Sequence, residues 1–470
     1  MTRSLEILGT LIAFGGLALI AIDAAGGGAP DLARIAGRAV MAAEQRSRIE
    51  DVIAAYPPLP LVLSLPFAFL AAGKVNAAGI ATALLAGAMA TVLYYRLRTQ
   101  PVDVSIAFAV TALVVVNPFT VQALVAGPET MLLMMAMLML GAGLFGFAGE
   151  ASAPDMMLIS TALALMAFAH PSGCILVMAS LPALAFAAPP SLLVAAPVGL
   201  FLMMLFPVVF SLLSFAYTRW ALGIEPFAFL DAVISAPRAR EGGEPMGLVS
   251  YALLFLPALL LAAPLLPAFA IWAWRRPPEL RPALALIGMV VLAGALQALL
   301  RGRVDLSLLL ALSLIAAAVC AAQMARERPA LVTALMAAGW GGAMVVAAKT
   351  ADRDGAAFAS ARTQPMPAAL ARALCPLKGV LVDTHADPEL VQLCGTARGF
   401  SVAGEADFDL QLQSRRLTSP FVLVGTDTAS TQLGLLAHAF PDLWRHGAAG
   451  YRLIFDQGGW RLYARQPLAY

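Results

Sequence analysis

The chain has 470 residues, of which 61% are hydrophobic and only 12% are charged, and its mean hydropathy is +0.83. Soluble globular proteins carry roughly 25% charged residues, so this composition excludes a soluble chain and predicts a polytopic membrane protein. The formal net charge is only +2, and no basic cluster is interleaved with aromatic residues, which argues against a nucleic-acid partner.

Apolar runs recur along the chain, and most are long enough to cross a hydrocarbon core of about 30 Å as helices. We interpret the first run as an uncleaved anchor rather than a signal peptide, because ten further runs follow it. The predicted spans are 5–22, 76–95, 104–116, 130–148, 157–169, 172–187, 192–215, 248–273, 283–299, 306–323 and 330–348. The sequence therefore predicts an α-helical polytopic membrane protein with about eleven transmembrane helices.

Residues 23–75, between the first two spans, are predicted to form an external loop. The first part, 23–55, contains four arginines and several acids, so it is too polar to lie in lipid. The second part opens with Tyr56-Pro57-Pro58-Leu59-Pro60 and contains Pro66. Prolines so placed disfavour a straight spanning helix, so we expect a short helix at the membrane interface.

Basic residues in the short loops predict the orientation of the chain. Those on one side of the predicted spans are Arg96, Arg98, Arg275, Arg276, Arg281, Arg326 and Arg328. The positive-inside rule makes that side the cytoplasm, although the four arginines of the first loop do not fit this rule, which weakens for longer loops. The first loop and everything after Lys349 are then external, that is, periplasmic in a bacterial inner membrane.

The tail has a different character, because it contains 22 of the 58 charged residues, eleven of each sign. Asp387, Pro388 and Glu389 predict the start of a helix. The other predicted elements are strands at 379–383 and 421–424, a helix at 431–444, and a hairpin of 451–455 and 460–464. We therefore expect a transmembrane domain at 1–350 and a small periplasmic α/β domain at 351–470.

The four cysteines fall into two classes. Cys174 and Cys320 lie inside predicted spans, where a cysteine is usually a small buried apolar residue. Cys375 and Cys394 flank the first strand and helix of the tail, where a periplasmic location allows either an oxidised pair or two free thiols. No paired Cys/His spacing indicates a zinc site.

Two carboxylates near the first span are candidates for chemistry at the external face. Asp23 ends the first span, and Asp31 opens the helix-like run that follows. One interpretation is that both cap helix ends and face water. The other is that they provide a general base at the membrane surface, or a ligand for a divalent cation such as Mg²⁺ or Mn²⁺.

Three further polar places lie in predicted external loops. Glu129 begins a helix, where an acid favoured by the helix dipole and a functional carboxylate are both open interpretations. Arg301 and Arg303 lie in a tight loop, against the positive-inside rule, which indicates either phosphate binding or snorkelling at the interface. His170 would place an imidazole at the external face, although a lone histidine is more often a hydrogen-bonded structural residue.

The order of these segments resembles the GT-C superfamily of integral membrane glycosyltransferases, especially bacterial aminoarabinose transferases and protein O-mannosyltransferases. The residues that carry the resemblance are Asp23 or Asp31 after the first span, Pro57-Pro58-Leu59 with Tyr56 where a lysine is common, Asn117-Pro118, Glu129 where those families usually have Asp, Arg301 and Arg303 before a late span, and the segment Arg219 to Phe227. The sequence lacks the adjacent Asp-Glu pair of those families.

This resemblance implies a GT-C-like fold and transfer of a sugar from a polyprenyl-phosphate-linked donor to a lipid, glycan or protein acceptor of the cell envelope. Asp31, or else Asp23, would act as the general base, with Glu129 as a further carboxylate. The residues implied in substrate binding are Tyr56, Pro57, Pro58, His170, Arg301 and Arg303. If Mg²⁺ or Mn²⁺ takes part, Asp31 and Glu129 would be its ligands; metal dependence stays open.

Two alternatives compete with a transferase. One is a non-catalytic GT-C-like scaffold in envelope polysaccharide assembly, which the missing Asp-Glu pair favours. The other is a transporter of a lipid or glycan, for which polar residues in the middle of spans and repeated halves would be typical. The predicted spans are nearly free of charge, and the two halves show no evident symmetry.

Overall fold

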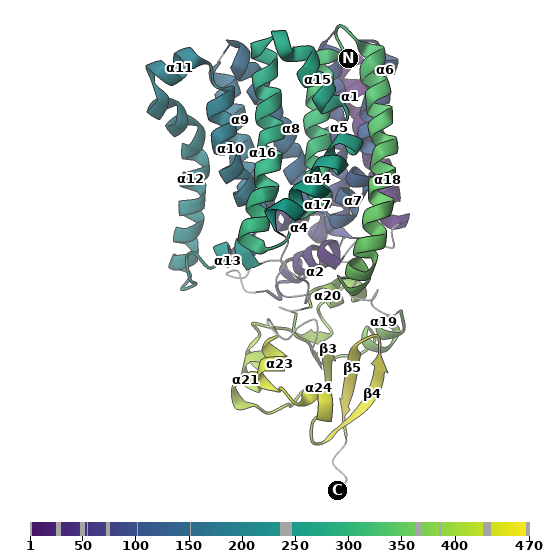
Figure 1. Ribbon diagram of the computed structural model, residues 1–470. Helices are drawn as coiled ribbons and strands as arrows, with labels where there is room; N and C mark the ends of the chain where they lie inside the picture. Colours follow the sequence, from purple (N-terminus) through teal and green to yellow (C-terminus); the bar gives the residue numbers. More distant parts are fainter. Residues whose placement is uncertain are drawn as a thin grey trace. The chain divides into compact units, whose positions relative to one another are not determined.

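The computed structural model describes residues 2–24, 30–47, 52–53, 55–71, 76–100, 102–150, 152–235, 247–361, 368–384, 387–425 and 434–466. The chain folds into two compact units (Figure 1). The first unit comprises residues 1–25, 82–238 and 242–352, and the second comprises 26–81, 239–241 and 353–470. In this division the first loop, expected as part of a transmembrane domain at 1–350, belongs to the same unit as the tail.

The first unit is helical. Its elements are α1 (Thr2–Ala24), α5 (Ala77–Thr99), α6 (Val104–Val115), α7 (Pro118–Ala126), α8 (Pro128–Glu150), α9 (Ala153–Ala169), α10 (Gly173–Ala187), α11 (Pro190–Ala195), α12 (Pro197–Ala221), α13 (Phe229–Ser235), α14 (Leu248–Ala262), α15 (Leu265–Trp272), the 3-10 turn η1 (Ala273–Arg275), α16 (Pro277–Arg301), α17 (Leu306–Met324) and α18 (Pro329–Ala361). The first turn of α5 and the end of α18 belong to the second unit.

Every apolar run predicted to span the membrane coincides with helix. Within the described residues, seven helices are long and apolar enough to cross a membrane, and nine segments qualify if each bent helix pair is one span. Helices α9 and α10 are apolar but have only 17 and 15 residues. The helices therefore lie at the positions of the eleven predicted spans. That all eleven cross the membrane stays a prediction.

One predicted span, 248–273, is bent, whereas the predicted span 104–116 corresponds to α6 alone and is followed, after a bend, by α7 in the segment expected as an external loop. The axis turns by 57° between α6 and α7, where Asn117 caps α7 and Pro118 is its first residue. It turns by 77° between α14 and α15, next to Pro264. Proline lacks the N–H group that would continue the preceding helix, so both breaks fall where the sequence cannot maintain the hydrogen-bond ladder.

Burial distinguishes the centre of the helical unit from its edge. In the most apolar window of α17, 83% of residues are buried, and this helix packs against α7, α8, α15 and α16. The corresponding fraction for α12 is 17%; this helix packs on α9 and lies at the side of the bundle (Figure 1). Helix α12 therefore exposes most of its apolar surface, as a helix that faces lipid would.

Two of the predicted cytoplasmic loops meet at one end of the first unit. Arg276 donates two hydrogen bonds to the carboxylate of Glu327, at 2.8 Å and 2.9 Å. These bonds favour the ionised carboxylate, so the pKa of Glu327 lies below its ordinary value. Arg276 also lies over the ring of Trp272, 4.3 Å from its centroid. The contact places both loops on the same side of the bundle, as the charge pattern predicts.

The second unit combines the first loop with the tail. Its elements are α2 (Pro30–Ala43), α4 (Pro58–Ala71), α19 (Ala368–Leu374), β1 (Val380–Leu381), α20 (Glu389–Cys394), β2 (Phe400–Ser401), α21 (Ala406–Ser414), β3 (Phe421–Gly425), α23 (Leu435–Ala439), α24 (Leu443–His446), β4 (Tyr451–Gln457) and β5 (Trp460–Arg465). Helix α4 is the short helix expected after Tyr56, and it contains Pro66.

The sheet of the tail has the strand order β2-β1-β3-β5-β4. Strand β1 pairs in parallel with β2 and β3, whereas β5 pairs antiparallel with β3 and β4. The hairpin and the buried strand β3 lie where the sequence predicts them. The single helix expected at 431–444 is wrong: the described part of that range forms two short helices, α23 and α24, separated by the turn at 440–442.

Candidate functional site

Arg301, one of the two predicted phosphate-binding arginines, is buried at the end of α16, with only 6% of its surface exposed. Its Nε donates to the backbone carbonyl of Val233 in α13 at 2.7 Å. Its Nη1 donates to the hydroxyl of Ser172, in the turn between α9 and α10, also at 2.7 Å. The planar guanidinium therefore links the end of α16 to α13 and to the turn between α9 and α10, which are far apart in the sequence.

The turn that receives Arg301 also contains His170. This histidine ends α9, and its Nδ1 accepts a hydrogen bond of 2.9 Å from the backbone N–H of Ser172. Helix α10 begins directly afterwards at Gly173, where a side chain would overlap the carbonyl oxygen of Met166. The structure thus brings His170 and Arg301 together through Ser172, and it gives His170 a structural hydrogen bond.

Arg303 lies in the loop that connects α16 with α17. Gly302 ends α16 in the left-handed conformation, with φ of 69°, which turns the chain away from the helix axis. The other end of the loop is fixed by Asp305, whose carboxylate caps α17 and whose backbone N–H donates to the side chain of Gln297 at 3.0 Å. Arg303 itself is half-buried. The fold therefore presents this guanidinium on a short loop with both ends anchored.

The remaining predicted residues of the first unit are two acids at helix ends. Glu129 occupies the first turn of α8 and is half-buried, where the helix dipole favours its charge. Asp23 is exposed in the last turn of α1. Asn117, named beside Glu129 in the sequence pattern, is buried, and its side chain accepts from the backbone N–H of Phe119 at 3.1 Å.

The other predicted residues belong to the second unit. Asp31 is the second residue of α2, and its side chain lies outside the described part of the chain. Tyr56 is half-buried and precedes Pro57, which is buried, and Pro58 begins α4. Cys375 and Cys394 form a disulfide whose Cα atoms are 5.2 Å apart.

The described residues include no group of three or more His, Cys, Asp or Glu side chains that could hold a metal ion. Glu129 and Asp31, the carboxylates considered for Mg²⁺ or Mn²⁺, lie in different units, and the side chain of Asp31 is not among those described.

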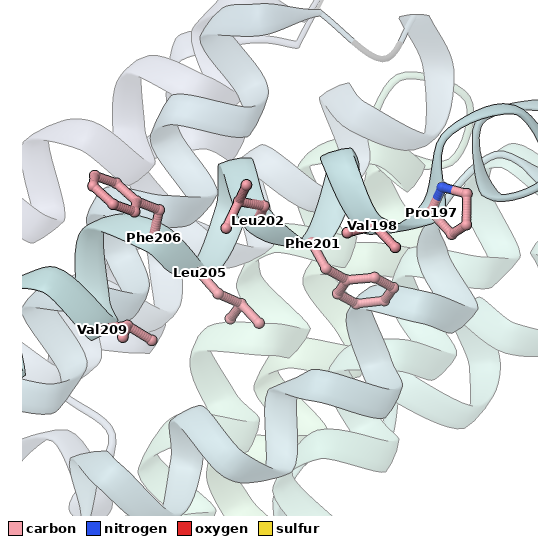
Figure 2. A pocket seen from close by; sticks show the side chains of 7 residues that line it. All are labelled: Pro197, Val198, Phe201, Leu202, Leu205, Phe206 and Val209. Carbon is pink, nitrogen blue, oxygen red and sulfur yellow. The ribbon is translucent and has the colours of Figure 1, made fainter.

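An open hollow of about 470 Å³ lies on the surface of α12 (Figure 2). Its lining residues are Pro197, Val198, Phe201, Leu202, Leu205, Phe206 and Val209. All are apolar, so the hollow offers no group that could hold a phosphate or a sugar hydroxyl. It suits hydrocarbon, in keeping with the low burial of α12.

Sequence reasoning gave no role to Ser172 or Gln297. Ser172 was visible only as part of the run after His170, and Gln297 as one polar residue near the end of an apolar run. A buried glutamine four residues before Arg301 lies on the same face of α16, and this spacing is the one signal that could have indicated its role.

A bundle of apolar helices joined to a small α/β unit is the architecture that the sequence resemblance implies for a GT-C-type membrane protein. ArnT from Cupriavidus metallidurans, whose crystal structure is bound to undecaprenyl phosphate, has this fold. The two chains are 13% identical, the match covers 98% of each, and the TM-score is 0.59. This similarity confirms the expected GT-C-like fold.

No protein-family model matches the sequence, and no curated protein is significantly similar to it.

Proposed function

We propose that this protein is a membrane glycosyltransferase that takes a sugar from a polyprenyl-phosphate-linked donor and transfers it to an envelope acceptor at the periplasmic face of the bacterial inner membrane. The observation that carries the proposal is the ArnT-like fold over 98% of the chain. The neighbour binds undecaprenyl phosphate, which has the two parts such a donor requires: a hydrocarbon chain and a phosphate.

Arg303 is the residue to which we assign the donor phosphate. The negative charge on the phosphate increases as the glycosidic bond breaks, and a fixed guanidinium stabilises that charge with two parallel hydrogen bonds. Arg301 is less suited to this task, because its Nε and Nη1 already bind Val233 and Ser172. We therefore assign to Arg301 the positioning of the loop that carries Arg303.

Asp31 is the proposed general base, with Asp23 as the alternative. A carboxylate would remove the proton from the acceptor hydroxyl as its oxygen forms a bond to the anomeric carbon and the phosphate leaves. The acceptor stays assigned only as a lipid, glycan or protein.

The test uses the purified full-length protein in liposomes, with undecaprenyl phosphate carrying a radiolabelled sugar. Lipid, polysaccharide and protein fractions of the envelope are offered as acceptors. We expect label in one of these fractions, and Asp31→Asn should reduce its rate of appearance by roughly 10²–10⁴. Asp442→Asn is the matched control, because this residue precedes α24 without a side-chain capping bond.

The alternatives predict other results. Full transfer by both Asp31→Asn and Asp23→Asn would remove the base assignment. A wild-type protein that binds undecaprenyl phosphate but transfers no sugar would contradict the proposal in favour of a non-catalytic scaffold. Transfer that is lost with EDTA and restored by Mg²⁺ or Mn²⁺ would show metal dependence.

A further inference from the structure

We infer that the tail domain holds helix α2 in a fixed position, and that the disulfide of the tail maintains the surface against which α2 packs. This inference rests on the proposed function, because α2 carries the proposed base Asp31 in its first turn. The helix belongs to the first loop, more than three hundred residues before the tail, and yet it is built into the core of the same unit.

One face of α2 is shaped to fit the tail. Gly37, Val40, Met41 and Glu44 follow one another at intervals of three, one and three residues, which places them on a single side of a helix. Val40 and Met41 are buried in the same apolar cluster as the residues of the tail, which are Leu370, Leu374, Val380, Val382, Leu390, Val391, Ala397, Phe400, Val402, Leu423 and Leu462.

Gly37 lies directly against the backbone at the start of α20. A Cβ atom at this position would overlap the carbonyl oxygen of Pro388, the residue that precedes α20. Because both atoms involved belong to backbone or to Cβ, no rotation of a side chain can relieve the overlap. A glycine is therefore required for the two segments to pack this closely.

Polar contacts fix the C-terminal end of α2 against the tail. The carboxylate of Glu44 accepts from the Thr396 hydroxyl and from the backbone N–H of Ala397, each at 2.8 Å. Arg46 forms an ion pair of 2.6 Å with Glu405 and donates to the carbonyl of Phe400 at 3.1 Å. Charged partners make these hydrogen bonds stronger than neutral ones.

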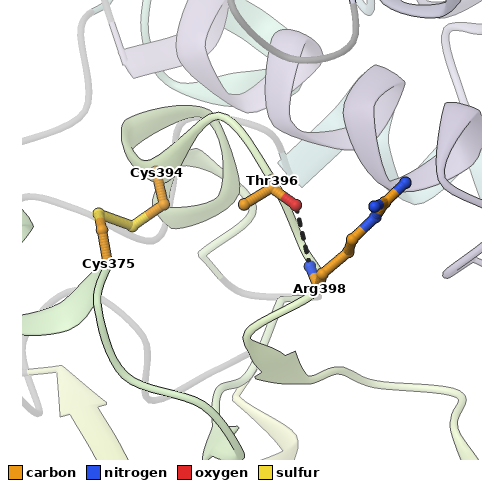
Figure 3. The surroundings of a disulfide bond; sticks show 4 residues. All are labelled: Cys375, Cys394, Thr396 and Arg398. Atoms are coloured by element: carbon orange, nitrogen blue, oxygen red, sulfur yellow. Dashed lines mark hydrogen bonds between the residues drawn. A yellow bond between two sulfur atoms is a disulfide. The ribbon is translucent and has the colours of Figure 1, made fainter.

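The disulfide lies next to this contact. Cys394 is the last residue of α20, and Thr396, which binds Glu44, follows two residues later (Figure 3). The hydroxyl of Thr396 also accepts from the backbone N–H of Arg398 at 3.2 Å (Figure 3). Cys375, directly after α19, ties the end of α20 to the neighbouring segment. Breaking the bond would release the backbone that holds Glu44.

The opposite face of α2 packs on α4, so the contact with the tail is one of two supports that set the orientation of α2. Ala39 packs against Leu61 and Ala68 of α4, so α2 lies between α4 and the tail. Removal of one support leaves the helix held on one side only. The first turn, with Asp31, would then lose its fixed direction, and a misplacement of about 1 Å can reduce a catalysed rate 10²-fold.

The experiment compares Gly37→Ala and Glu44→Ala with Gly288→Ala in the full-length protein. Gly288 lies in α16 with no atom within 4 Å of an added Cβ, so it is the matched glycine control. The first measurement is hydrogen exchange of the amides of residues 32–43 and 389–394. We expect faster exchange there in both test variants and unchanged exchange in α16 and α17.

The second measurement is sugar transfer from undecaprenyl-phosphate-linked donor, resolved into kcat and KM. We expect both test variants to lower kcat about tenfold or more while KM for the donor changes less than twofold. Glu44→Gln, which keeps an acceptor oxygen, should retain an intermediate rate. Cys375→Ser combined with Cys394→Ser should reproduce the increased exchange and the lower kcat.

The outcomes separate this inference from the proposed function. Unchanged exchange of α2 in both Gly37→Ala and Glu44→Ala would overturn the docking arrangement, whether or not the protein transfers sugar. Increased exchange with wild-type kcat would overturn the positioning role alone. An inactive wild-type protein would contradict the proposed function, and the positioning role would then fall with it, while the exchange data would still decide the docking.

Discussion

Arg301 and Arg303 are two residues apart but differ in surroundings, and this difference is the reason for our proposal that Arg303 binds the donor phosphate. Arg301 is buried and uses two of its nitrogens within the fold. Arg303 is half-buried on a loop whose ends are held by the φ of Gly302 and by the Asp305 cap. The sequence could identify both as polar residues at the end of an apolar run, but it contains no information on their partners.

Arg303→Lys should weaken binding of undecaprenyl phosphate. A lysine keeps the charge but cannot form two parallel hydrogen bonds with a phosphate, so we expect a loss of about 1.5 to 3 kcal/mol. Donor affinity in liposomes measures the effect, and the melting temperature should not change. Arg452→Lys, on the exposed face of β4, serves as the control. Unchanged affinity in Arg303→Lys would mean that the arginine only anchors the loop at the interface.

Arg301→Lys should instead lower stability. The single ammonium group of lysine cannot donate to both the Val233 carbonyl and the Ser172 hydroxyl as the guanidinium does. We therefore expect the free energy of unfolding to fall by about 1.5 to 3 kcal/mol. Thermal unfolding in detergent provides the measurement. A melting temperature equal to that of the wild type, together with weaker donor binding, would reverse the roles assigned to the two arginines.

At the scale of elements, the sequence predicts where the helices lie along the chain better than it predicts where they bend. Hydropathy locates a helix under each predicted span, because lipid requires a continuous run of apolar residues, but it left the apolar helix α7 in an expected external loop. It did not separate α14 from α15, although Pro264 marks that break, whereas the predicted span 104–116 ends just before the break at Pro118. Proline also occurs inside unbroken helices, as at Pro182 in α10 and Pro207 in α12, so its presence alone does not decide the matter.

Neighbouring glycines in α18 provide a test of helix packing. A Cβ at Gly342 would overlap the carbonyl oxygen of Leu261 in α14, whereas a Cβ at Gly341 would meet nothing within 4 Å. Gly342→Ala should therefore destabilise the protein by about 1 to 3 kcal/mol. Gly341→Ala should be neutral or stabilising by up to about 1 kcal/mol, because alanine favours helix. Equal melting temperatures for the two variants would show that α14 and α18 do not pack this closely.

At the scale of the whole molecule, the sequence suggests that the first loop and the tail are separate, whereas the fold places them in one unit. Composition alone divides the chain near residue 350, because the tail is charged and the preceding part is apolar. The structure nevertheless builds residues 26–81 into one unit with the tail. Contacts between segments so far apart in the chain produce no pattern in the local sequence from which they could be predicted. The one signal was the face of α2 formed by Gly37, Val40, Met41 and Glu44, which resembles any amphipathic surface until its partner is known.

The composition of the second unit predicts the topology of the membrane protein. Because the first loop and the tail fold together, both must lie on the same side of the membrane, and the positive-inside rule predicts that the basic loops at Arg98 and Arg328 lie on the other. Alkaline phosphatase fused after residue 470 should therefore be active, since it folds in the oxidising periplasm. Fusions after Gln100 and after Arg328 should be inactive. Activity of either of these two fusions, with an inactive C-terminal fusion, would place the disulfide-bonded tail in the cytoplasm and contradict the proposed periplasmic reaction.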